Sequence, residues 1–192
     1  MPYKDKTKQL IAMRAINKRY RDNHKGLYKS KLFFAYLAGI VDGEGSLGLY
    51  IHKQPLAEHK LGYMYQPQIV IVNTELKMLQ YIEANVNEKL DIKPGLRQFE
   101  RIGGFITSTK GGKYSIKPVY ELRFRSMWQV KRLIDAIHPY LVSKKEIAGL
   151  IAQFCELRLN RKRHKAPYGE EEVHLYNQIR LLSPRSSKRL MP

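Results

Sequence analysis

Two carboxylates lie two residues apart where an apolar stretch of the chain ends. They are Asp42 and Glu44, and Gly43 and Gly45 alternate with them. A carboxylate at the tip of a helix could hold Mg²⁺, which prefers oxygen ligands, and Mg²⁺ can activate water and stabilise charge during hydrolysis of a phosphodiester. Taken alone, however, the four residues are better interpreted as two helix-end acids with turn glycines.

The apolar stretch before these acids, residues 32–41, predicts a buried helix. It is too short to span a bilayer, which requires about 20 apolar residues. Spacings of three and four residues give this helix two faces. One face can cover the protein's own core and contains Phe33, Leu37, Ile40 and Val41. The other is flat enough for a second backbone to approach and contains Tyr36, Gly39 and Gly43.

The segment Leu37 to Gly45, LAGIVDGEG, resembles the signature of the LAGLIDADG homing endonucleases. Ile40, Val41, Gly43 and Glu44 replace Leu, Ile, Ala and Asp of the family name. The resemblance extends over about residues 29–156 and looks closest to the single-motif branch, whose members act as homodimers. It implies that Glu44 binds a catalytic Mg²⁺, or Mn²⁺ in its place, beside the backbone carbonyl of Gly43.

The same resemblance implies a dimer interface on the motif helix. Its contact residues would be Tyr36, Gly39, Asp42 and Gly43, with Asp42 capping the end of the partner's helix. Two identical subunits would read related half-sites, so the target would be long and approximately palindromic.

Three more catalytic candidates follow from the resemblance. Residues 139–141, Pro-Tyr-Leu, match a turn that precedes a basic residue near the cut site in family members, and Lys144 falls at the corresponding place. Lys144 would orient the attacking water or offset phosphate charge. Asn73 and Lys77 correspond to two polar positions of the same water network, and an ordinary surface role for Lys77 stays open.

The charge of the chain points to a polyanionic partner. Its 192 residues include 35 Lys and Arg against 17 Asp and Glu, a formal net charge of +18. Nucleic acid is the first candidate. A membrane surface is the second, but no signal peptide, apolar span or lipidation motif is visible. We therefore expect an intracellular protein, in a prokaryotic cytoplasm or in a chloroplast or mitochondrion. The single cysteine, Cys155, lies in an apolar helical run and is predicted to be a core residue.

Hydrophobic periodicity predicts an α+β fold with an αββαββα core. Strands are expected at residues 46–52, 65–73, 96–107 and 113–125, the last two joined by a hairpin at 110–112; helices are expected at 75–90, capped by Thr74, and at 127–137, 144–159 and 171–182. The organisation would be a basic extension at 1–28, the endonuclease-like core at 29–160, and a basic loop, short helix and tail at 161–192. As in the family, a saddle-shaped antiparallel sheet would lie on DNA with helices packed behind it.

Alternation along the strands leaves a hydrogen-bonding set on the other sheet face: Tyr50, His52, Gln66, Gln68, Glu121, Arg123 and Arg125. Such groups can read base edges in the major groove of double-stranded DNA. Arg185, Lys188 and Arg189 of the tail are further DNA-binding candidates. An ordinary solvated face of an antiparallel sheet is the alternative for any single residue.

Together these features predict a Mg²⁺-dependent homing endonuclease that makes double-strand cuts and is encoded in a mobile intron. An RNA maturase that assists intron splicing, with intron RNA as partner, is one alternative. A DNA-binding regulator that does not cleave is another. Glu44 together with Lys144 favours the nuclease.

Overall fold

The computed structural model describes residues 30–53, 62–99, 106–108, 114–116, 118–161 and 167–183. Its elements are a first helix at residues 30–43, then β1 (Gly45–Lys53), β2 (Tyr63–Asn73), α2 (Leu76–Leu90), β3 (Gly95–Phe99), β4 (Ile106–Ser108), β5 (Tyr114–Ile116), β6 (Val119–Phe124), α3 (Met127–Ile137), a 3-10 turn (His138–Tyr140), α4 (Lys145–Leu159) and α5 (Glu170–Leu182). This order confirms the expected α+β class. Each of the last two expected strands is divided into two described strands. The expected hairpin at 110–112, the extension at 1–28 and the tail lie outside the described residues.

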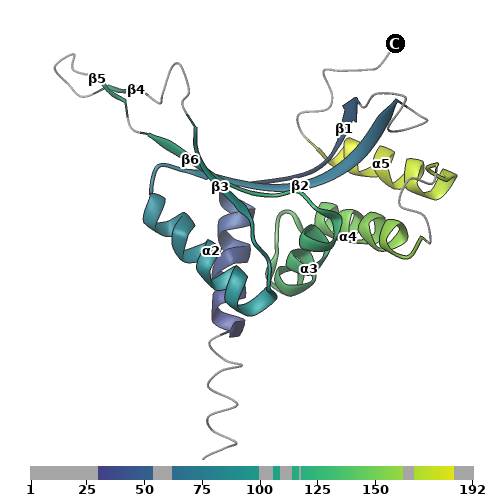
Figure 1. Cartoon of the computed structure of the whole chain (residues 1–192), viewed down its shortest axis with the longest axis horizontal. Helices are drawn as coiled ribbons and strands as arrows, with labels where there is room; N and C mark the ends of the chain where they lie inside the picture. The colour runs from purple at the N-terminus through teal and green to yellow at the C-terminus, as the bar shows by residue number, and fades with distance from the viewer. Residues whose placement is uncertain are drawn as a thin grey trace, which may run out of the picture.

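A four-stranded antiparallel sheet forms the centre of the fold. Its strand order is β1-β2-β6-β3, and β4 and β5 form a separate pair. Figure 1 shows the sheet as a curved layer, with α2, α3 and α4 all on one side of it. The opposite, concave side carries no helix in the part of the chain that the structure describes. One face of the sheet is therefore available to a partner.

The core lies between the sheet and these helices. Strand residues alternate as predicted, so that side chains two positions apart are buried: Leu47 and Leu49, Ile69 and Ile71, Leu122 and Phe124. The first helix contributes Leu37 and Val41, both fully buried, whereas Ile40 is only partly buried. Cys155 is a core residue as predicted, and burial raises the pKa of its thiol to about 12. Within the described ranges, no helix has the length and apolar character that a bilayer crossing requires.

The start of α2 differs from the prediction in one detail. Thr74 is not the cap, because the residue in the N-cap position is Glu75. The Glu75 N–H donates to Asn73 Oδ1 over 2.8 Å. An Asn side chain that bonds the backbone two residues later forms a local turn of its own, so Asn73 shapes the turn that leads into α2.

A buried ion pair joins α5 to α4. Glu172 is 0% exposed and Arg158 is 4% exposed, and the Arg158 Nη1 donates to Glu172 Oε1 over 3.3 Å. Arg161 Nη2 lies 2.7 Å from Glu172 Oε2, and the Gly169 N–H donates to the same oxygen over 2.5 Å. The α5 helix also contacts β1. It is thus packed on the central layer, although it follows the expected core at residues 29–160.

Replacing the buried carboxylate should destabilise the protein strongly. Glu172→Ala removes the buried carboxylate that Arg158 and Arg161 share, and breaking a buried pair costs about 3–5 kcal/mol. We expect a loss of that size in the free energy of unfolding, measured by urea denaturation. Glu171→Ala, at an exposed neighbouring position, is the matched control and should change it by no more than about 0.5 kcal/mol. Equal losses in the two variants would contradict a stabilising role for the pair.

Candidate functional site

The motif ends in an exposed carboxylate between the first helix and β1. The Glu44 N–H still donates to Ile40 O over 2.8 Å, and Gly45 already belongs to β1. A Cβ atom on Gly45 would lie 2.7 Å from Val41 O and 2.8 Å from Val41 Cα. Because these are backbone atoms that cannot move away, only glycine allows the chain to pass directly from helix to strand. The exposed Glu44 side chain therefore projects from a tight junction.

Asn73 holds the Glu44 carboxylate. Its Nδ2 donates to Glu44 Oε2 over 2.5 Å. The other end of the same amide, Oδ1, accepts the Glu75 N–H, and a backbone N–H can only donate. The orientation of the amide is thereby fixed with its Nδ2 toward Glu44. Two of the predicted catalytic residues are brought together.

Asp42 binds the start of α4 within its own chain. Its Oδ2 accepts the Val142 N–H over 2.7 Å, and its Oδ1 accepts the Ser143 hydroxyl and the Lys144 N–H over 3.0 Å each. The carboxylate thus caps the start of α4 in its own chain. Burial raises the pKa of Asp42, but these hydrogen bonds lower the pKa by more, so the net shift is downward. A contact of Asp42 with a second chain stays a prediction.

Lys144 lies at the motif tip, as the sequence predicted. Its Nζ donates to Val41 O over 2.8 Å and also to Asp42 O, carbonyl groups at the end of the first helix. Desolvation lowers the pKa of Lys144, and the nearby Asp42 charge only partly opposes this shift. The ammonium group therefore caps the first helix, while Asp42 caps α4.

Lys77 is not drawn into this site. It is exposed in the first turn of α2, and in the described ranges no hydrogen bond or ion pair joins it to Glu44, Asn73 or Lys144. Its catalytic role stays a prediction. The described residues also contain no group of three or more His, Cys, Asp or Glu side chains that could hold a metal ion. One chain thus offers Glu44, and the neighbouring backbone carbonyl of Gly43, as oxygen ligands.

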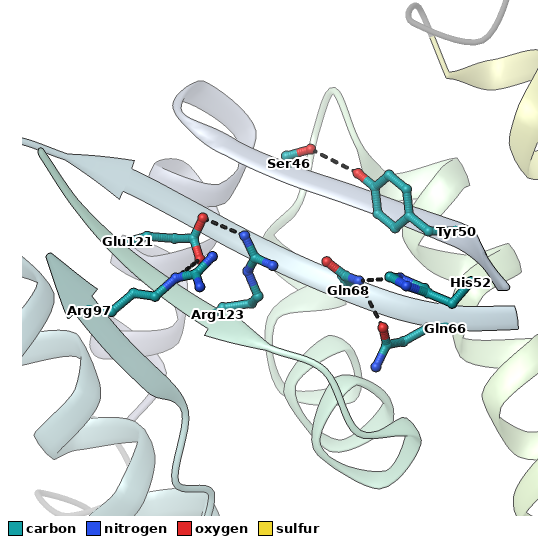
Figure 2. A network of polar contacts seen from close by, with 8 residues as sticks. All are labelled: Ser46, Tyr50, His52, Gln66, Gln68, Arg97, Glu121 and Arg123. Carbon is teal, nitrogen blue, oxygen red and sulfur yellow. Dashed lines mark hydrogen bonds and ion pairs between the residues drawn. The ribbon is translucent and has the colours of Figure 1, made fainter. Parts of the chain in front are cut away.

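Two polar networks cover the open face of the sheet (Figure 2). In the first, Glu121 accepts from Arg97 Nε over 3.0 Å and from Arg123 Nη2 over 2.5 Å. Burial raises the pKa of Glu121, but the hydrogen bonds and charges of the two arginines lower the pKa by more. The net shift is downward, which favours the ionised carboxylate. Arg97 was not among the predicted site residues. Its alternation with Leu96 was visible in the sequence, but the pairing of β3 with β6, which puts Arg97 opposite Glu121, was not.

In the second network, Gln68 Nε2 donates to His52 Nε2 and to Gln66 Oε1, over 3.1 Å in each case. Nearby, the hydroxyl groups of Tyr50 and Ser46 lie 3.4 Å apart. The ring of Tyr50 lies against Gly48, where a Cβ atom would be 2.8 Å from the ring. The side chains of Ser46, Tyr50, His52, Gln66 and Gln68 share the predicted face, as Figure 2 shows. Arg125 is exposed just after β6, whereas Arg185, Lys188 and Arg189 lie outside the described residues.

Comparisons with known proteins give a match at the level of structure. No family model and no curated protein matches the chain. The homing endonuclease I-CvuI, in complex with a DNA target, superposes with a TM-score of 0.60 at 20% identity, covering 85% of this chain and 89% of that one. The archaeal intron-encoded homing endonuclease I-Vdi141I, complexed with DNA, gives a TM-score of 0.59 at 17% identity, covering 82% and 88%. The chain has the LAGLIDADG homing endonuclease fold.

The LAGLIDADG fold is also found in a chain of about twice this length. The meganuclease I-SmaMI, bound to DNA, matches with a TM-score of 0.55 at 17% identity, and the match covers 82% of this chain but 45% of that one. At such identities the likeness concerns the fold. The function of the fold in this chain depends on the residues described above.

The role of Asp42 within its own chain can be tested through pH. Asp42→Asn should lower the free energy of unfolding by about 1–2 kcal/mol at pH 6, the usual loss when a helix cap is weakened. Because the folded pKa is depressed below the ordinary value of 3.8, the stabilisation is present above that value and is lost as the pH falls through the folded pKa. The difference between the two proteins should thus shrink at pH 3, measured by urea denaturation. Asp135→Asn, at an exposed acid of α3, is the control and should show a smaller difference at pH 6. A pH-independent difference for Asp42→Asn would contradict the capping role.

Proposed function

We propose that the protein is a site-specific DNA endonuclease that makes double-strand cuts in a long, roughly palindromic target with the help of Mg²⁺. One observation carries the proposal. The exposed Glu44 carboxylate, held by Asn73, is placed directly at the start of a strand whose sheet presents guanidinium, amide and imidazole groups on its open face. The same fold carries DNA in I-CvuI and I-Vdi141I. We further propose a gene in a mobile intron, as in the intron-encoded I-Vdi141I, and a protein that works inside a prokaryotic cell or an organelle.

The residues at the tip fit a hard divalent cation. Glu44 and the Gly43 carbonyl would hold Mg²⁺, or Mn²⁺ in its place, through oxygen atoms. When bound, such an ion lowers the pKa of its water and stabilises charge on the phosphodiester oxygens. Asn73 keeps the carboxylate in one orientation. Lys144 fixes the helix end from which this carboxylate projects and adds positive charge beside the phosphate.

A homodimer is proposed on the basis of two glycines. Gly39 and Gly43 are exposed on the first helix, and a Cβ atom on either would meet no described atom within 4 Å. Glycine within a helix costs about 1 kcal/mol relative to alanine, and nothing in the described part of the chain requires it there. Close packing of the same helix from a second copy would explain both. The coverage of 45% of I-SmaMI agrees, since two copies of this chain would match its length.

Cleavage should depend on the Glu44 charge. We expect the purified protein with Mg²⁺ to cut a plasmid library of randomised palindromic sites at one recurrent sequence. Glu44→Gln preserves the shape but removes the charge, and the rate of double-strand cutting should fall by about 10³-fold or more. The readout is the linearised plasmid and the sequence of its ends.

Two controls accompany this experiment. EDTA should abolish cutting by the unchanged protein, and Glu75→Gln, an exposed acid at the start of α2, should leave it intact. Binding to DNA without cutting, in every lane, would overturn the nuclease and favour the regulator. Binding to group I intron RNA alone would favour the maturase.

The dimer can be tested at Gly39. In a single chain, Gly39→Leu has free space and adds a residue that favours helix, so the helix content should be preserved. In a dimer it would overpack a close contact at a cost of about 1–3 kcal/mol, and the dimer dissociation constant should rise by about 10- to 100-fold. Sedimentation equilibrium measures this change. Gln153→Leu, an exposed position on α4, is the matched control. An unchanged dissociation constant for Gly39→Leu would show that another face makes the dimer.

A further inference from the structure

Glu121 lies on the face proposed to contact DNA, yet it is among the least exposed residues there. Its relative exposure is 4%. Each of its two oxygens accepts a hydrogen bond from a different arginine, Oε1 from Arg97 and Oε2 from Arg123. A glutamate that reads cytosine must present an oxygen to the N4 amino group in the groove. Glu121 is buried and already paired, so its geometry suits a residue that holds other side chains in place better than one that contacts a base.

The register of the strands explains how one carboxylate reaches both arginines. Arg97 on β3 is the direct cross-strand partner of Glu121 on β6, and Arg123 follows Glu121 by two residues, on the same face. Figure 2 shows the carboxylate joined by dashed lines to the guanidinium groups on either side of it. Two cations this close would repel each other in a chain of net charge +18. The carboxylate between them removes that repulsion and holds both side chains in one arrangement.

The arginines remain more accessible than the acid that holds them. The side chain of Arg97 is 48% exposed and that of Arg123 is 21% exposed, against 6% for Glu121. Arg123 Nε is buried and has no hydrogen-bond acceptor among the described residues, and Arg123 is anchored to Glu121 through Nη2. An arginine ordered in advance loses less rotamer entropy when it binds, and bidentate contact of arginine with guanine O6 and N7 is the commonest specific contact in the major groove.

We infer that Glu121 is a positioning residue, and that it fixes Arg97 and Arg123 as one coupled guanine-reading pair, an inference that rests on the proposed DNA function. Arg97 is then a specificity residue of this chain. Glu121 sets base preference only through the two guanidinium groups. It makes no base contact of its own, in contrast to the interpretation of the sequence alone.

The test is selection of preferred sites from a randomised double-stranded DNA library, with Ca²⁺ in place of Mg²⁺, the ion under which I-SmaMI was bound to uncleaved DNA. The variants are Arg97→Gln, Arg123→Gln, Glu121→Gln and the double variant Arg97→Gln with Glu121→Gln. All should lose guanine preference at the same one or two positions of each half-site, by about 10- to 100-fold. The double variant should lose no more than either single one, because the residues act as a unit.

Two further measurements distinguish a positioning role of Glu121 from a role only in linking the two strands. Glu121→Gln removes a negative charge from the DNA-facing side, so affinity for random DNA should rise while discrimination falls. Glu88→Gln changes the charge equally, at an acid of α2 whose side chain is 76% exposed, and should leave the base preference unchanged. Should Glu121→Gln fold poorly, Glu121→Asp keeps the charge but shortens the reach, and we expect loss of preference at the same positions.

Three results would overturn the inference. If Glu121→Gln lost base preference at a position where Arg97→Gln and Arg123→Gln keep it, Glu121 would itself contact that base. An unchanged base preference in folded Glu121→Gln would make it only a link between strands. If the unchanged protein selected no preferred sequence, the proposed DNA function itself would be wrong. This outcome is distinct from the other two because it is seen in the unchanged protein alone.

Discussion

The end of the first helix depends on two charged side chains that cap each other's helices. The carbonyl groups at the end of a helix need donors, and the N–H groups at the start of the next need acceptors. Lys144 supplies the donor to the first helix, and Asp42 supplies the acceptor to α4. Because the two residues are 102 positions apart in the sequence, this exchange joins the beginning of the fold to its last third. The Glu44 junction rests on that connection from one side and on Asn73 from the other.

On the open face of the sheet, two buried polar residues each hold more exposed ones. Gln68 and Glu121 are 7% and 4% exposed, and each holds two neighbours that reach further toward solvent. Side chains that must recognise a partner act best when other side chains have already fixed their rotamers. The polar face is therefore more than a set of independent groups, since each network ties residues of two neighbouring strands. Substitution of one deep residue would disturb two shallow ones.

Much of this architecture could be predicted from the sequence. Periodicity located α3 correctly from Met127 to Ile137, and alternation identified the buried apolar pairs of β1, β2 and β6, which are Leu47 and Leu49, Ile69 and Ile71, and Leu122 and Phe124. The nine-residue motif indicated the fold and placed Glu44 at the helix tip. These features depend on neighbours in the sequence or on one strong motif, which a single chain records well.

The details that the sequence did not reveal depend on distant neighbours. Alternation tells which side of a strand a residue faces, but not which strand lies beside it. Arg97 was overlooked for that reason, since only the β3–β6 pairing brings it beside Glu121. The partner of Asp42 lies in another third of the chain. Thr74 is not the cap, because the helix begins one residue later than expected, with Glu75 in the N-cap position.

The junction at Gly45 has one more consequence. Glu44 is followed at once by β1, with no loop between them. If the chain cuts DNA as proposed, the distance from the reacting phosphate to each recognised base is set by the rise of a strand, about 3.3 Å per residue. The sheet would then fix the distance between the cut and the recognised bases. Changing the side chains that read the bases would alter which sequence is selected, but the cut would stay at the same offset from the centre of the site.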